Sequence, residues 1–127
     1  MTEPIWIARA EILAIHDLQL SEHGGAAGLR DVGLLESALA RPQQIFAYGD
    51  PDIFSLAAAY TAGIVRNHPF VDGNKRTGFV TGVLFLELNG TQFTAAEPDA
   101  TQAMFALAAG QLSEENFTAW LRDNCSA

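Results

Sequence analysis

Residues 68–90 read HPFVDGNKRTGFVTGVLFLELNG, so that a polar, turn-forming stretch leads directly into an apolar one. Pro69 disfavours helical geometry at the residue before it, which predicts that a helix ends just ahead of His68 and that His68 lies in an extended loop. Gly73 permits a tight turn, and a new helix is expected to begin near Asn74. The stretch therefore predicts two helices joined by a short polar loop.

The second of these helices is predicted to be the central helix of the fold. Residues 79–88 are apolar on nearly every side, which is typical of a helix surrounded by others. Gly78 and Gly82 share one face, where a neighbouring backbone can approach closely. Each glycine costs about 1 kcal/mol relative to alanine in a helix, so the pair implies a packing requirement. Asn89-Gly90 is a typical helix end.

Periodicity and turn residues predict about six helices in all. The other five are residues 6–22, a short helix after Asp31 that Pro42 terminates, a helix from Asp52 to about Asn67, one from about Pro98 to Gly110, and a last one after the N-cap Ser113. Residues 45–48 and 91–94 are expected to be short and extended. The sequence thus predicts one all-α domain over residues 1–127, a compact helical bundle around a central buried helix, with at most a short flap hairpin.

Composition limits the classes of function. The formal net charge of −8 argues against direct nucleic-acid binding, which needs a basic surface. The apolar run at 79–88 is too short to span a membrane, and no secretory signal precedes the first helix. The single cysteine, Cys125, allows no intrachain disulfide. We expect a cytoplasmic protein.

The predicted loop and helix start have the composition of an anion site. The first turn of a helix presents free backbone N–H groups and the positive end of the helix dipole. Lys75 and Arg76 fall in that turn, where cations are unfavourable unless an anion is bound. Asp72 is suited to hold Mg²⁺ between phosphates, and His68 is suited to accept a proton from a hydroxyl. Together these groups are what phosphoryl transfer requires.

Each residue also has a plainer interpretation. A single loop histidine such as His68 is usually structural, Asp72 is equally suited to be an ordinary N-cap, and Asn74 is common at helix starts. For the basic residues Arg66, Lys75 and Arg76, the plainer interpretation is pairing with nearby acids. Only the order and spacing together indicate a catalytic site.

The nine residues from His68 to Arg76 resemble the signature of the Fic/Doc (Fido) superfamily, in its death-on-curing branch. The resemblance extends over most of the chain and includes these further blocks: GG at 24–25, GLRD at 28–31, LLESALARP at 34–42, AAAY at 57–60 and FLELNG at 85–90.

The resemblance implies a role for each motif residue. His68 is expected to be the general base that activates a hydroxyl of a target protein, and Asp72 the Mg²⁺ ligand. The expected anion hole around the nucleotide phosphates consists of Gly73, Asn74, Lys75 and Arg76. Arg66 lies outside the motif but is expected to assist with phosphates, and residues 43–50 correspond to the flap that aligns the target peptide.

Two positions distinguish between chemistries within the superfamily. Members that transfer AMP usually have glycine where Lys75 stands and an arginine where Phe79 stands. Both departures match the death-on-curing branch, which implies transfer of the ATP γ-phosphate to a Ser/Thr hydroxyl. The branch further implies a toxin that arrests translation through a factor such as elongation factor Tu, restrained by an antitoxin segment that folds on binding. AMP transfer and a non-catalytic binding module of the same fold remain the alternatives.

A histidine metal site is the remaining alternative. His16 and His23 share one helix face, but their backbones lie roughly 10 Å apart along it, too far to share one zinc ion. Both are interpreted as core or surface residues.

Overall fold

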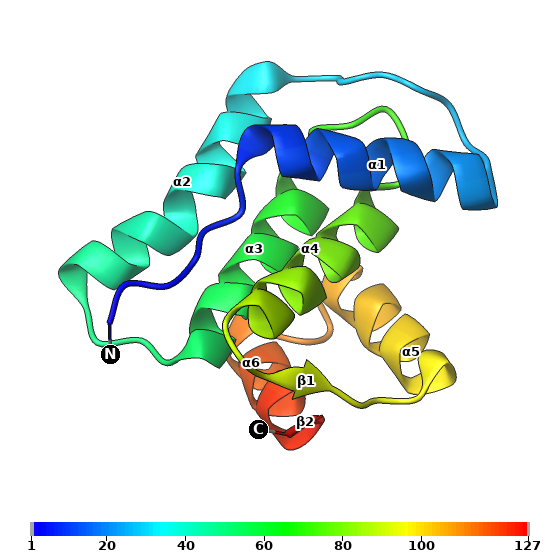
Figure 1. Cartoon of the computed structure of the whole chain (residues 1–127). Coiled ribbons are helices and arrows are strands. Elements are labelled where there is room, and N and C mark those ends of the chain that lie inside the picture. Colours follow the sequence, from blue (N-terminus) through cyan, green and yellow to red (C-terminus); the bar gives the residue numbers. More distant parts are fainter. Residues whose placement is uncertain (1, 127) are drawn as a thin grey trace.

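The computed structural model describes residues 2–126 and consists mainly of helices (Figure 1). The elements are α1 (Arg9–His23), α2 (Val32–Tyr48), α3 (Ile53–Asn67), α4 (Asn74–Leu88), β1 (Gln92–Phe93), α5 (Glu97–Ala108), α6 (Glu114–Asp123) and β2 (Cys125–Ser126). The predicted all-α bundle of six helices is confirmed. No helix in the described part of the chain is long and apolar enough to cross a membrane.

The central helix is α3, and the prediction that α4 has this role was wrong. Every residue from Leu56 to Val65 is buried, and α3 contacts α2, α4, α5 and α6 (Figure 1). On α4 the buried residues occupy one side, whereas Phe79 and Val80 are only half-buried because they line a cavity. The small side chains Ala57, Ala58, Ala59 and Ala62 let neighbouring helices approach α3 from several directions.

The expected close approach at Gly78 and Gly82 is confirmed, and the partner is α3. A Cβ atom on Gly78 would lie 3.1 Å from the carbonyl oxygen of Thr61, and one on Gly82 would lie 2.2 Å from Thr61 Oγ1. That hydroxyl donates a hydrogen bond of 2.8 Å to the carbonyl of Gly78. Since α3 leads into the polar loop and α4 leads out of it, this contact fixes the two ends of the loop relative to each other.

Helix α2 continues past Pro42, so the prediction that Pro42 ends it was wrong. Residues 45–48 are helical and not extended, and most of the expected flap at 43–50 is the last turn of α2 and not a hairpin. Proline removes one hydrogen bond within a helix, but the turns on both sides of Pro42 are held by packing. Leu35 and Leu39 are buried before it, and Phe46 after it packs edge-on against Trp6 with ring centroids 5.6 Å apart.

The N-terminal segment is extended where helix was predicted, and α1 begins only at Arg9. Its backbone is held by polar side chains of other helices. The amide of Ile5 donates to Asn89 Oδ1 at 2.8 Å, and the amide of Ile7 donates to the hydroxyl of Tyr60 at 3.0 Å. Because these amides have partners elsewhere, they do not enter the helix.

The remaining helix boundaries follow the expectations closely. Asp31, Asp52 and Ser113 each accept a hydrogen bond from the first turn of the helix they precede. The extended segment at 91–94 contains β1, which pairs in antiparallel orientation with β2 near the C-terminus, with Phe93 opposite Cys125. The partner strand β2 was not predicted, because two residues carry no periodicity.

Candidate active site

The loop of residues 68–73, which we call the motif loop, joins α3 to α4 and is anchored by a buried phenylalanine. Phe70 is 1% exposed. The buried side chain of Asn74 accepts a hydrogen bond from the Phe70 amide and donates one to the Phe70 carbonyl, each at 3.0 Å. The Asn74 side chain therefore fixes the loop, while its backbone amide remains among the donors at the start of α4.

His68 ends α3 in a left-handed conformation, with φ 54° and ψ 53°, so the extended geometry predicted for it was wrong. It is the only non-glycine residue with positive φ among residues 2–126. The conformation costs on the order of 1–2 kcal/mol. It is held by two hydrogen bonds: the His68 amide donates to the Ile64 carbonyl at 3.0 Å, and Arg30 Nε donates to the His68 carbonyl at 2.7 Å. Such held strain is common at functional sites.

The loop between α1 and α2, residues 24–31, lies along the motif loop. Its contacts are made largely by main-chain atoms: Leu29 forms a β-bridge with Phe70, the amides of Arg30 and Asp31 donate to the Pro69 carbonyl, and the Val71 amide donates to the Gly28 carbonyl. Main-chain pairing of this kind leaves no periodic signal, so sequence analysis did not assign this segment to the site.

Asp72 is not the N-cap of α4, a position that belongs to Gly73. Its exposed carboxylate accepts hydrogen bonds from the amides of Gly73 at 2.8 Å and Ala26 at 3.3 Å. These two bonds, followed by the charges of Lys75 and Arg76, hold the pKa of Asp72 below its ordinary value. The carboxylate is therefore ionised at neutral pH, the form that a divalent cation requires.

The start of α4 presents hydrogen-bond donors that have no partner in the described part of the chain. No acceptor within residues 2–126 is hydrogen-bonded to the amides of Asn74, Lys75 or Arg76, while the next amide, that of Thr77, donates to the Gly73 carbonyl at 3.0 Å. Gly73 adopts φ 79° and offers no side-chain cap. Free amides, the helix dipole and two cations converge on one end of α4, and phosphate oxygens fit this set of donors.

A cavity of about 740 Å³ brings the expected catalytic groups together. Its lining comprises the motif residues His68, Asp72, Gly73, Asn74, Lys75 and Arg76, the end of α1 (Gln19, Glu22, His23), Phe79 and Val80 of α4, Phe93, Ala95, and one side of α5 (Glu97, Ala100, Thr101, Met104, Phe105). The volume lies within the roughly 300–1,000 Å³ typical of ligand sites. The cavity is therefore large enough for a small-molecule ligand beside the helix start.

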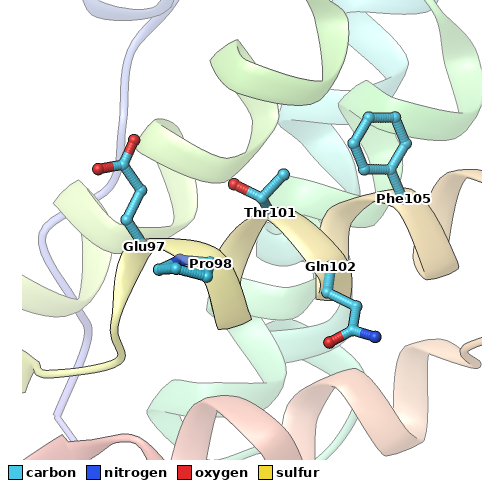
Figure 2. Close-up of a pocket in the computed structure, with 5 residues that line it drawn as sticks. All are labelled: Glu97, Pro98, Thr101, Gln102 and Phe105. Atoms are coloured by element: carbon cyan, nitrogen blue, oxygen red, sulfur yellow. The ribbon is translucent and has the colours of Figure 1, made fainter.

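A second, shallower hollow of about 630 Å³ over α5 shares three lining residues with the cavity. Figure 2 shows these residues, Glu97, Thr101 and Phe105, projecting from one side of the helix. Lys75 Nζ lies 5.6 Å from the centroid of the Phe105 ring, within the range of a cation–π contact. The Lys75 ammonium thus reaches across the cavity from α4 to α5.

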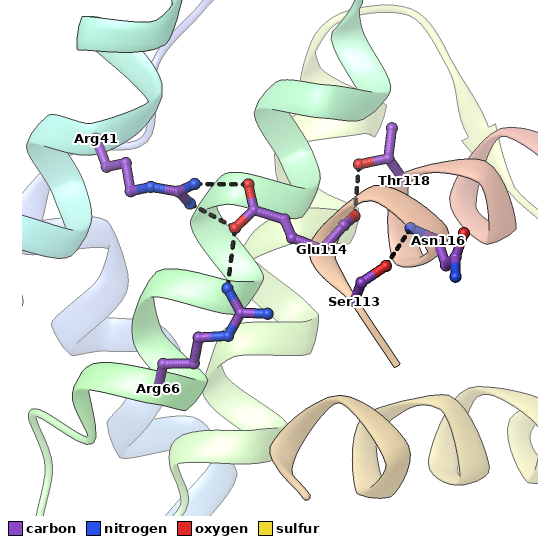
Figure 3. A network of polar contacts seen from close by, with 6 residues as sticks. All are labelled: Arg41, Arg66, Ser113, Glu114, Asn116 and Thr118. Carbon is purple, nitrogen blue, oxygen red and sulfur yellow. Dashed lines mark hydrogen bonds and ion pairs between the residues drawn. The ribbon is translucent and has the colours of Figure 1, made fainter. Parts of the chain in front are cut away.

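Arg66 is not among the residues that line the cavity. Its Nη1 lies 3.3 Å from Oε1 of Glu114. Arg41 donates to the same carboxylate, from Nη1 to Oε1 at 2.7 Å and from Nη2 to Oε2 at 2.8 Å (Figure 3). The three side chains join α2 and α3 to the start of α6. The placement of Arg66 gives no support to the expectation that it assists with phosphates.

The two histidines of α1 have different surroundings. His23 lines the cavity, whereas His16 is 3% exposed and stacks on Phe70, with ring centroids 3.8 Å apart. His16 Nε2 lies 2.8 Å from the carbonyl oxygen of Asp72. Residues 2–126 contain no group of three or more His, Cys, Asp or Glu side chains arranged to hold a metal ion. Sequence analysis had assigned His16 only to packing and missed its contact with the motif loop.

Comparison with known proteins gives one family and two relatives. The family model described as the Fic/DOC family matches residues 6–86. The chain is 34% identical over 117 residues to the protein named "Protein kinase doc" of Escherichia phage P1, covering 91% of this chain and 92% of that protein. It is 39% identical over 99 residues to "Toxin Doc" of Mycolicibacterium smegmatis, covering 75% of this chain and 71% of that protein.

Proposed function

Because this chain belongs to the Fic/DOC family and is a toxin of its Doc branch, a transferase-type enzyme, we propose that it transfers the γ-phosphate of ATP to a Ser/Thr hydroxyl of a protein. The observation that carries the proposal is the shared cavity, which contains a histidine, an ionised carboxylate and the open start of a helix beside two cations. Phosphoryl transfer depends mainly on positioning and charge stabilisation, which such a cavity supplies.

Each group has a distinct role in the proposed reaction. The imidazole of His68 accepts the proton of the attacking hydroxyl as the new phosphate ester forms and the bond from the γ-phosphorus to its bridging oxygen breaks, which releases ADP. The amides at the start of α4, with Lys75 and Arg76, hold the phosphates of ATP and stabilise negative charge on the transferred group. Asp72 would hold Mg²⁺, which would supply charge neutralisation for the phosphates. Asn74 contributes by holding the motif loop through Phe70.

Two cavity residues favour phosphate transfer over AMP transfer. The superfamily members that transfer AMP usually have arginine at the position of Phe79, and an apolar ring there offers no donor to a phosphate. They usually have glycine at the position of Lys75, whose ammonium here extends toward Phe105 and occupies that part of the cavity. The relative of phage P1 is also named a kinase.

The proposed biological context is a cytoplasmic toxin–antitoxin pair. The target would be a translation factor such as elongation factor Tu, and its modification would arrest translation. An antitoxin segment that folds on binding would restrain the enzyme. These assignments rest on the Doc branch and on the relative named a toxin.

The test is to incubate the protein with a bacterial lysate, Mg²⁺ and ATP labelled at either the α or the γ phosphate. Label from the γ position alone is expected on a target protein, and none with His68→Ala or after chelation of Mg²⁺. Label from the α position would show AMP transfer instead. If His68→Ala remained as harmful to cells as the intact protein, a non-catalytic binding role would replace both.

A further inference from the structure

We infer that two residues outside the motif, His16 and Arg30, act as positioning residues. His16 fixes Asp72, the proposed metal ligand, and Arg30 fixes His68, the proposed general base. The inference rests on the proposed function, because it assigns Asp72 and His68 the roles given above. Each side chain bonds to the main-chain carbonyl of one of these two residues, and each comes from a different element. The four-residue spacing of the motif alone does not determine where the two groups point.

His16 holds the Asp72 end of the motif loop from the buried side. Its Nε2 lies 2.8 Å from the carbonyl oxygen of Asp72, and because a carbonyl only accepts, Nε2 carries the proton. The ring is buried, lies nearly parallel to Phe70 with an interplanar angle of 10°, and approaches within 3.7 Å of the point where a side chain on Gly73 would begin. A buried ring packed on two sides has little freedom, so the carbonyl it binds is fixed.

Arg30 holds the other end of the loop. Its Nε donates to the His68 carbonyl at 2.7 Å and its Nη2 donates to the Asn67 carbonyl at 3.0 Å. The planar guanidinium therefore spans two successive carbonyls at the end of α3, which lysine cannot match with one ammonium. This contact accompanies the left-handed conformation of His68, which a residue before proline does not favour on its own.

Because the two contacts are made at opposite ends of the motif loop, their effects on the site should be separable. Loss of the His16 contact should displace the Asp72 carboxylate and weaken metal binding. Loss of the Arg30 contact should let His68 leave its left-handed conformation and slow the chemical step. Replacing residues that orient functional groups from behind commonly lowers metal affinity or activity by roughly 10–100-fold.

The His16 arm compares His16→Phe, which keeps an aromatic ring on Phe70 but removes the donor, with His16→Gln, which keeps an N–H donor. Mn²⁺ binding is measured by water proton relaxation in the presence of a non-hydrolysable ATP analogue. We expect Mn²⁺ affinity to fall about tenfold or more in His16→Phe and to remain largely intact in His16→Gln. Equal loss in both variants would overturn the hydrogen-bond assignment.

The Arg30 arm compares Arg30→Met and Arg30→Lys with Arg9→Met. Arg9 is matched as a surface arginine, since it pairs only with the half-exposed Glu36. We expect both Arg30 variants to lower kcat about tenfold or more, with the KM for ATP and the Mn²⁺ affinity unchanged, and Arg9→Met to behave as wild type. A parallel fall of kcat and Mn²⁺ affinity in the Arg30 variants would show one general structural effect and overturn the separation.

Amide hydrogen exchange of residues 68–73 in the free protein tests the inference without ATP or turnover. Faster exchange is expected at the Asp72 end in His16→Phe and at the His68 end in Arg30→Met, with core amides unchanged. Wild-type exchange rates in both variants would overturn the inference even if the enzyme is active. A wild-type protein that transfers no phosphate but shows these exchange differences would instead refute the proposed function alone.

Discussion

Replacing Gly82 with alanine measures how tightly the two helices that carry the motif loop are joined. The new Cβ would lie 2.2 Å from Thr61 Oγ1 and 3.2 Å from the Ala57 carbonyl oxygen. Thr61 must then move its hydroxyl and give up the hydrogen bond to Gly78. Overpacking typically costs about 1–3 kcal/mol, and a lost hydrogen bond adds about 0.5–1.5 kcal/mol. Alanine regains about 1 kcal/mol of helix propensity, which leaves a net loss of roughly 0.5–3.5 kcal/mol.

The assay is urea unfolding of Gly82→Ala, Thr61→Ala and the double variant, followed by circular dichroism. Because the closest clash is with a hydroxyl that Thr61→Ala removes, the double variant should be more stable than the sum of the single effects by about 1 kcal/mol or more. Gly33→Ala is the matched control, since its Cβ would meet only Asp31 Oδ1 at 3.3 Å near the helix end. Strictly additive effects in the cycle would refute the contact as the reason for glycine at position 82.

Three further predictions follow from the site. Asn74→Ala leaves the buried amide and carbonyl of Phe70 without their side-chain partner, so the free energy of unfolding measured in urea should fall by about 1–3 kcal/mol. An unchanged midpoint of unfolding would contradict the role given to Asn74. Calorimetry should show an unchanged affinity for ATP in Arg66→Met and a lower affinity in Arg76→Met. A loss of affinity in both variants would indicate that Arg66 contributes to phosphate binding. The pKa of Asp72 is lowered in the folded protein, so the contribution of its carboxylate to stability is present above the ordinary value of 3.8 and is lost as the pH falls through the lower folded value. Between neutral pH and pH 3, thermal unfolding should therefore show a smaller loss of stability for Asp72→Asn than for wild type. Identical losses would argue against the hydrogen bonds from Gly73 and Ala26.

Much of the fold was predictable because the helix ends carry local signals. Asp31, Asp52 and Ser113 accept hydrogen bonds from the turns they precede, and side-chain capping of this kind is visible in a few residues of sequence. Pro42 misled because its local cost is offset by packing of the helix turn that follows, and packing is a property of the whole fold. The central helix was predicted wrongly for a similar reason. The alanine-rich segment 56–65 has smaller apolar side chains than residues 79–88, although it is more completely buried.

The motif residues of the site were predictable from the sequence, but the residues that hold the motif loop in place were not. The order of residues from His68 to Arg76 indicated a phosphate site, and His68 lines one cavity with residues 72–76. The left-handed backbone of His68 was missed because Pro69 alone favours an extended residue, and the hydrogen bond from Arg30 is set by a loop distant in sequence. The ion pair of Arg66 was missed for a related reason, because proximity in sequence to His68 does not reveal a pairing with Glu114 on another helix.

The loop at residues 24–31 has a thermal consequence. Its residues 24–28 are exposed, yet its main chain supports Pro69, Val71 and Asp72. Segments with little buried apolar surface open at much lower free energy than a helical core. Warming should therefore abolish activity through transient opening of this loop. This loss is expected over a temperature range in which circular dichroism still reports intact helices. The upper working temperature would then be set by a handful of peripheral hydrogen bonds, well short of the melting point of the bundle.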